Sequence, residues 1–189
     1  RGDRSAVIHG ERRLDHAAFH TSMARQAAAL AAAGLQPGDR FVVLAGNRAE
    51  VLVLLGAAAW LGAVMVPLNL RLSASELAQQ VQDSSARLVV LEPAFEAALD
   101  TALPDGLGPA RRLLLDAAPE AGLALAGDEP APLAAPPVVG RSDDAVLMLY
   151  TAAVDGRARG AVVSQRNLVA SSAQLGLAWS TWIPGLIWS

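Results

Sequence analysis

Short apolar runs alternate with longer alanine- and leucine-rich stretches along most of the chain. The runs at 40–44, 64–66 and 88–91 have the length of buried strands, and turn residues separate them from the neighbouring stretches. Residues 16–33 predict a long helix, which Gly34 ends as its C-terminal cap. This alternation of helix and buried strand predicts an α/β fold, a mostly parallel sheet with flanking helices.

Turn and capping signals predict further elements. Residues 6–8 and 12–15 predict a hairpin at the start of the chain, and Asn47 is expected to cap the helix that follows the strand at 40–44. Ser73 and Glu76 have the Ser-x-x-Glu spacing of a capping box. A helix that contains Glu76 is therefore expected to begin at Ser73 or Ser75.

The last part of the chain differs in composition. Residues 119–141 are rich in alanine and proline, and we expect a surface connector within a single domain of residues 1–189. Elements are predicted on both sides of this connector, and they lie at 93–103 (helix), 112–116 (strand), 145–150 and 161–164 (strands flanking a loop) and 167–179 (a helix starting at Asn167).

One uncharged run could be mistaken for a membrane span. It covers the 18 residues 51–68 and so reaches the minimum spanning length. Gly56, Gly62 and Pro67 interrupt it, and crossover helices and strands of parallel sheets are also uncharged when buried. We therefore expect a buried helix, a turn at Gly62 and a buried strand, and no transmembrane segment.

Composition excludes several kinds of chemistry. The net charge of −3 provides no basic surface, so no nucleic-acid partner is expected. The absence of cysteine excludes disulfides and thiolate chemistry and fits a cytoplasmic location. All 15 basic residues are arginine, which excludes any mechanism that needs a lysine of these residues. His16 and His20 share a helix face but have no evident third ligand, so we expect a solvated pair and no metal site.

The segment YTAAVDGRARG at 150–160 has the layout of a phosphate-binding loop. It follows an apolar strand, contains Gly156 and Gly160, and carries Arg159 before the next strand. Such a loop needs small residues so that backbone N–H groups can approach phosphate oxygens, hydroxyls that donate hydrogen bonds, and a cation. The small residues and the cation are present, whereas Thr151 carries the only hydroxyl between 151 and 160.

Other motifs occur in an order that chance would not supply. They are GLQPGDR at 34–40, NRAE at 47–50 and LGAVMVPLN at 61–69. Together with the loop they resemble the amino-terminal part of the AMP-dependent synthetase/ligase superfamily, the adenylate-forming enzymes that include the acyl-CoA synthetases. The resemblance implies a partial adenylate-forming N-terminal domain, with 180–189 as a tail unlike the family.

The family pattern at the loop is YTSGTTGxPKG. Thr151, Gly156 and Gly160 match it, and Arg159 holds a positive charge where the family has lysine. The resemblance makes these four residues the candidate phosphate contacts. Three hydroxyl-bearing positions of the pattern are replaced, and they are Ala152, Val154 and Asp155.

These replacements predict weak nucleotide binding. A hydrogen bond to a charged group contributes about 1.5–3 kcal/mol, so the loss of two or three donors weakens triphosphate binding by roughly a thousandfold or more. Asp155 also adds a negative charge beside the phosphates, and Val154 tolerates positive φ poorly. We expect Arg159 to offset only part of this loss.

An intact relative, as the resemblance implies, activates a small-molecule carboxylate with ATP and Mg²⁺ and then forms a thioester with CoA. This chain contains no Gly-x-Thr-Glu adenine motif and no counterpart of the family's carboxy-terminal lid, so we assign no catalytic residue and expect no adenylation by this chain alone. Three interpretations stay open. The chain is part of such an enzyme, which a C-terminal polypeptide could complete; or it is a non-catalytic remnant or pseudoenzyme that acts through protein contacts; or it is another mononucleotide-binding α/β domain.

Overall fold

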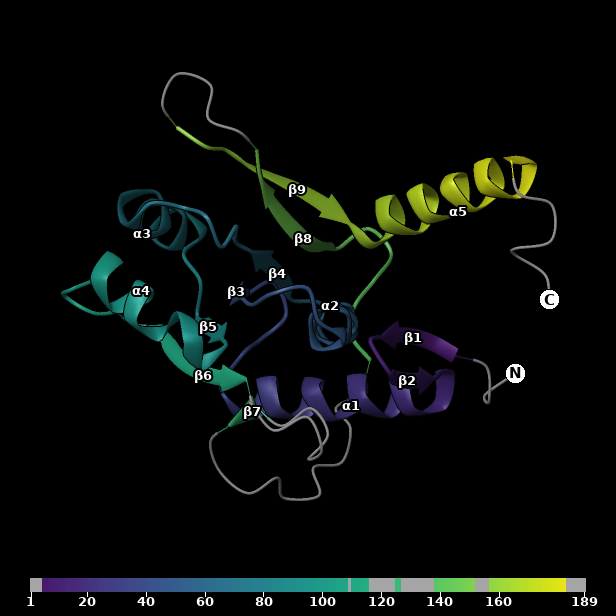
Figure 1. Cartoon of the computed structure of the whole chain (residues 1–189), viewed down its shortest axis with the longest axis horizontal. Helices are drawn as coiled ribbons and strands as arrows, with labels where there is room; N and C mark the ends of the chain where they lie inside the picture. Colours follow the sequence, from purple (N-terminus) through teal and green to yellow (C-terminus); the bar gives the residue numbers. More distant parts are fainter. Residues whose placement is uncertain (1–4, 109, 116–124, 127–137, 152–156, 183–189) are drawn as a thin grey trace.

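The computed structural model describes residues 5–108, 110–115, 125–126, 138–151 and 157–182. A hairpin of β1 (Ser5–His9) and β2 (Arg12–Asp15) opens the chain, as the sequence predicts, and leads into α1 (His16–Ala32). Figure 1 shows this hairpin beside α1 and apart from the large sheet. The large sheet has seven strands in the order β7-β6-β5-β3-β4-β8-β9.

The five inner strands of this sheet are parallel, which confirms the predicted mostly parallel architecture. The two edge strands, β7 and β9, each pair antiparallel with their neighbour. The strands are β3 (Arg40–Leu44), β4 (Val64–Pro67), β5 (Leu88–Leu91), β6 (Arg111–Leu115), β7 (Leu125–Ala126), β8 (Ala145–Tyr150) and β9 (Gly160–Ser164).

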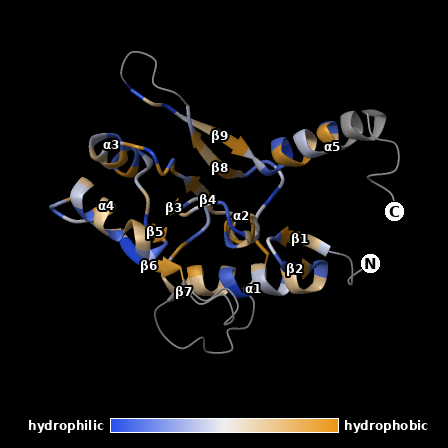
Figure 2. Ribbon diagram, viewed as in Figure 1, coloured by the Kyte–Doolittle hydropathy of each residue, from blue (hydrophilic) through white to orange (hydrophobic). Residues whose placement is uncertain are grey.

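Helices cover both faces of the sheet because alternate strand residues point in opposite directions. Phe41 and Val43 of β3 pack with α1 and with α2 (Ala49–Leu61) in one apolar cluster. Val42 and Leu44 pack with α3 (Ala74–Ser84) and α4 (Glu96–Ala102), which follows a 3-10 turn at Pro93–Phe95, in a second cluster. Figure 2 shows hydrophobic colours along the inner strands. The result is a three-layer sandwich whose central strands are buried on both faces.

The predicted helix signals at glycine and serine are confirmed. α1 ends at Ala32 with Ala33 as its C-cap, and Gly34 comes directly after this cap with φ 96°. Gly62 ends α2 in the left-handed region with φ 66°. Neither conformation suits a residue with a Cβ atom. Ser73 accepts a hydrogen bond from the Glu76 N–H and forms the full capping box at the start of α3.

The predicted starts of two helices are wrong. The N-cap of α2 is Arg48 and the helix begins at Ala49, so Asn47 is not its cap. The last helix, α5 (Gln165–Trp182), begins before Asn167, because Ser164 and Asn167 exchange hydrogen bonds through side chain and backbone. This reciprocal pattern places Asn167 inside the first turn.

The connector and the tail lie largely outside the described residues. Within the connector the structure describes β7, a two-residue strand that pairs with β6, so part of this segment belongs to the sheet. The predicted tail overlaps the end of α5 at residues 180–182. The uncharged run 51–68 divides into α2, a turn at Gly62 and β4, as predicted. None of the described helices combines the length and apolar character that a membrane crossing requires.

A buried carboxylate ties the N-terminal hairpin to the sheet. Glu50, at the start of α2, is 5% exposed. Its two oxygens meet Arg12 of β2 at 2.7 Å and Arg48 at 2.8 Å. Arg48 also approaches Glu92 at 3.6 Å, and Glu92 accepts a hydrogen bond from the Gly46 N–H at 2.7 Å. These contacts join the hairpin, the start of α2 and the carboxyl ends of β3 and β5.

The two arginines determine the ionisation of Glu50. Burial alone would raise the pKa of its carboxyl group, because desolvation penalises the charge. Hydrogen bonds from Arg48, the backbone and Arg12 outweigh that effect and lower the pKa from its ordinary value of 4.5 to about 2. Glu50 therefore stabilises the folded chain fully above pH 4.5, and this contribution is lost as the pH falls towards 2.

The first prediction concerns this acid dependence. Glu50→Gln should lower the free energy of unfolding at pH 7 by about 3 kcal/mol, because it removes a buried charge that pairs with the partly buried guanidinium groups of Arg12 and Arg48. It should also flatten the loss of stability between pH 4.5 and pH 2. Urea denaturation followed by tryptophan fluorescence at a series of pH values measures both. Glu11→Gln, at an exposed site in the hairpin turn, is the matched control, and equal pH curves for the two variants would contradict the role of Glu50.

Candidate functional site

The candidate loop connects β8 to β9 at the carboxyl edge of the parallel strands. β8 runs parallel to β4 through the pairing of Met65 with Leu147, and it pairs with β9 as far as Tyr150 and Gly160. Figure 1 shows the two strands as a hairpin that extends beyond α3. Ligands of open α/β sheets bind outside the carboxyl ends of the strands, so the loop stands where this fold class places its binding sites.

Thr151 lies at the end of β8, where the loop begins. Its N–H donates to the Arg159 carbonyl at 3.0 Å, and its hydroxyl is 3.4 Å from the same oxygen. The single hydroxyl hydrogen of a threonine can serve one acceptor at a time. In this conformation Thr151 closes the hairpin, and a phosphate would have to compete for its hydroxyl.

Gly160 lies close to the Met148 side chain, which would have to shift to admit a Cβ atom. A Cβ atom at this position would lie 2.8 Å from the Met148 sulfur and 3.6 Å from the Tyr150 ring. Its backbone is not in the left-handed region, so close approach explains the glycine and backbone strain does not. Gly156, the remaining glycine among the candidates, lies outside the described residues.

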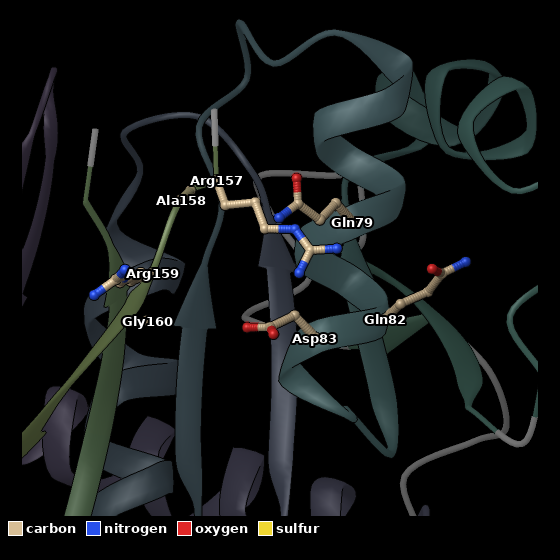
Figure 3. A pocket seen from close by; sticks show the side chains of 7 residues that line it. All are labelled: Gln79, Gln82, Asp83, Arg157, Ala158, Arg159 and Gly160. Carbon is tan, nitrogen blue, oxygen red and sulfur yellow. The ribbon is translucent and has the colours of Figure 1, made fainter. Parts of the chain in front are cut away.

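Two arginines follow the loop on the segment 157–160 that leads into β9, which we call the arm of the hairpin. Arg157 and Arg159 are both exposed, and within the described part of the chain neither forms an ion pair. Sequence analysis singled out Arg159, because it stands where the family has lysine. Figure 3 shows that the Arg159 side chain points away from α3, whereas the Arg157 side chain reaches towards it.

A pocket of about 600 Å³ lies between this arm and α3. It was not predicted, because no sequence pattern links α3 to a segment seventy residues later. The polar side chains of the exposed turn of α3 supply one wall and the arm supplies the other. The lining residues are Gln79, Gln82, Asp83, Arg157, Ala158, Arg159 and Gly160.

A hydrogen bond fixes the distance between the two walls. The Tyr150 hydroxyl donates to Asp83 at 2.7 Å and also lies 3.2 Å from the Gln80 carbonyl. Burial raises the pKa of the Tyr150 phenol above its ordinary value of 10, and the hydrogen bond and charge of Asp83 raise it further. The phenol therefore stays protonated and holds the end of β8 against α3. The sequence alone gave Asp83 no part in the site.

The described residues offer partial support for a nucleotide. The Arg157 guanidinium and the carboxamides of Gln79 and Gln82 can meet an anionic group in the pocket. Within those residues no three His, Cys, Asp or Glu side chains gather as a metal site. His20, half of the histidine pair, lies against the Trp60 ring at a centroid distance of 5.1 Å.

The fold and the loop together define an α/β domain of the class that binds ligands at the carboxyl edge of a parallel sheet. Comparison with known families narrows this class. The AMP-binding enzyme family matches residues 1–184, and the chain belongs to this family.

Individual relatives are CoA and carrier-protein ligases. A feruloyl-CoA synthase from Amycolatopsis is 39% identical over 164 residues, covering 87% of this chain and 31% of the relative. The fatty acid–[acyl-carrier-protein] ligase ScoC from Streptomyces coeruleorubidus is 32% identical over 194 residues, covering 95% and 34%. The crystal structure of ATP-bound MatB from Rhodopseudomonas palustris is 28% identical, with a TM-score of 0.71 over 89% of this chain and 33% of that one. The chain thus spans about a third of the length of these relatives.

The second prediction concerns the Tyr150–Asp83 contact. Tyr150 is the only tyrosine of the chain, so its ionisation can be followed by ultraviolet absorbance without interference from another phenol. The titration midpoint should lie above 10 and should fall in Asp83→Asn, which removes the charge but keeps an acceptor oxygen. Tyr150→Phe should cost about 1–2 kcal/mol of stability, because a hydrogen bond to a charged group is lost. A midpoint at or below 10 in the unaltered chain would show that the phenol does not donate to Asp83.

Proposed function

We propose that this chain is the amino-terminal part of an AMP-forming acyl-CoA synthetase domain and that its loop at 151–160 is a degenerate site for the phosphates of ATP. The observation that carries this proposal is the position of the loop at the carboxyl edge of a parallel sheet in a chain of the AMP-binding enzyme family. The ATP-bound state of the relative MatB supports the nature of the ligand.

The side chains around the loop support phosphate contact more than tight nucleotide binding. The family pattern assigns the phosphate contacts to Thr151, Gly156, Arg159 and Gly160. We propose that Thr151, Gly156 and Gly160 would line the phosphates and that one of the two arginines after the loop, Arg157 or Arg159, would supply the cation. The Thr151 hydroxyl lies against the Arg159 carbonyl, so a phosphate must replace a contact within the hairpin to use it. The substitutions at Ala152, Val154 and Asp155 leave the loop with too few donors to surround a triphosphate.

We infer the remaining components from the family. In a complete enzyme, ATP with Mg²⁺ would activate a small-molecule carboxylate, and CoA would accept the acyl group. The names of two relatives, a feruloyl-CoA synthase and a fatty acid–[acyl-carrier-protein] ligase, support a carboxylate substrate and a thiol acceptor. A C-terminal polypeptide would have to supply the adenine motif and the lid, and a cytoplasmic location would give access to ATP and CoA.

A second candidate is a non-catalytic remnant that acts through protein contacts. The observation in its favour is the exposure of several large apolar side chains at the β8–β9–α5 end, where Val162 is 58% exposed and Val169 is 70% exposed. Exposed apolar side chains of this size favour association with another surface. Under this proposal the loop has no ligand, and restoring its hydroxyls should have no effect on nucleotide binding.

The third prediction separates the two candidates. The unaltered chain should bind ATP with a Kd weaker than about 10 μM, because two or three charge-assisted hydrogen bonds are missing. A variant with Ala152→Ser, Ala153→Gly, Val154→Thr and Asp155→Thr should bind about a hundredfold to a thousandfold more tightly. Isothermal titration calorimetry with MgATP measures both values.

Ala170→Ser, on an exposed position of α5, serves as the control for adding a hydroxyl away from the loop. It should leave the affinity for ATP unchanged. A Kd below 10 μM in the unaltered chain would contradict the degeneracy of the loop. A restored variant that gains no affinity would favour the non-catalytic remnant.

A further inference from the structure

On the basis of the phosphate-binding function proposed above, we propose that Arg157, and not Arg159, binds the anionic group of a ligand in the pocket between α3 and the hairpin, and that Asp83 opposes this binding. The ligand class is a phosphate or polyphosphate group. The family pattern has its lysine at the position of Arg159, so the sequence alone favours Arg159 as the residue that binds the anion.

The direction of the two side chains carries the distinction. In a regular strand, residues two apart point to the same side, so Arg157 and Arg159 would share a face. Residues 158 and 159 are not in a strand, and regular pairing in β9 begins at Gly160. In Figure 3 the Arg157 guanidinium lies between the arm and α3, close to Gln79 and above Asp83, while the Arg159 guanidinium extends from the opposite side of the arm.

Arg157 is available for a ligand. It is exposed, and within the described residues it forms no ion pair and no side-chain hydrogen bond. Its planar group can donate two parallel hydrogen bonds to a phosphate. The carboxamide of Gln79 on the facing helix can add a donor to the same group. A phosphate in this pocket would therefore contact the arm and α3 at once.

The negative charge of Asp83 disfavours the binding of phosphate groups in the pocket. Its carboxylate lines the pocket and is held there by the Tyr150 hydroxyl at 2.7 Å. Repulsion between this charge and a phosphate at the Arg157 guanidinium reduces the affinity that the arginine provides. Asparagine at this position would keep an oxygen for the Tyr150 hydroxyl while removing the charge. Substitution of Asp83 should therefore change binding in the opposite direction to substitution of Arg157.

The fourth prediction tests these opposite signs. Inorganic pyrophosphate and MgATP are titrated by calorimetry into the full chain and into the loop-restored variant, each with Arg157→Gln, Arg159→Gln or Asp83→Asn. Arg157→Gln should weaken binding by about tenfold to a hundredfold, since a charge-assisted contact is lost. Asp83→Asn should strengthen it by about threefold to tenfold. Arg159→Gln should change it by less than about threefold, through long-range charge alone.

The controls keep a structural effect apart from a binding effect. Arg157 and Arg159 are both exposed, so their variants should share the urea midpoint of the unaltered chain. Arg157→Lys should recover part of the affinity, because it keeps the charge but not the planar pair of donors. A folding defect would weaken binding in every variant and could not produce the gain expected of Asp83→Asn.

The outcomes distinguish this inference from the function on which it rests. If Arg159→Gln weakens pyrophosphate binding at least as much as Arg157→Gln, Arg157 is not the anion-binding residue, although the phosphate site itself remains. If Asp83→Asn weakens binding, the proposed opposition of Asp83 is wrong. If neither pyrophosphate nor ATP binds to the unaltered or the loop-restored chain, both the phosphate site and the role of Arg157 are overturned.

Discussion

Burial of the central strands on both faces is the constraint on which the rest of this structure depends. β3 and β5 contribute alternate residues to two separate apolar clusters, so a shift of one residue would exchange the two layers. This two-sided burial fixes the register of the sheet. The register in turn determines where along the sheet each strand ends. Tyr150 emerges at the carboxyl end of β8 because the preceding residues Val146 and Leu147 are held in the core. The position of the loop is thus a consequence of packing and does not require a ligand.

Polar contacts add order at this edge of the sheet. Glu50 joins the hairpin to α2 through two arginines, and Tyr150 joins β8 to α3 through Asp83. Both contacts involve a carboxylate, and each bridges segments that are far apart in sequence. A carboxylate held in this way supports the fold, yet its charge also acts on any ligand nearby. Asp83 shows the conflict, because the residue that positions the loop also places a negative charge in the pocket beside it.

Sequence reasoning succeeded where the signal is local or strongly periodic. The parallel sheet, the glycine ends of α1 and α2 and the capping box of α3 were predicted, since each depends on a few neighbouring residues. It failed at Asn47, because this good capping residue stands one position before the actual N-cap, Arg48, which makes no capping bond through its side chain. It also could not find the pocket. The approach of Asp83 to the arm depends on tertiary packing, and the opposite directions of Arg157 and Arg159 depend on an irregular backbone.

The loop differs from the family pattern in a way that the structure makes intelligible. Tyr150, Thr151 and Gly160 agree with the pattern, and each contributes to the hairpin itself. The Tyr150 hydroxyl donates a hydrogen bond to Asp83 of α3, and the Thr151 N–H donates one to the Arg159 carbonyl across the hairpin. Gly160 leaves space for the Met148 side chain. The replaced positions, Ala152, Val154 and Asp155, are those whose hydroxyls the pattern supplies for phosphate. A chain that no longer bound ATP would still lose stability if its hairpin residues changed, whereas loss of the hydroxyls would cost it little. The surviving residues of the loop are therefore better indicators of the fold than of the activity, and Arg157 provides the charge with which residual binding can be measured.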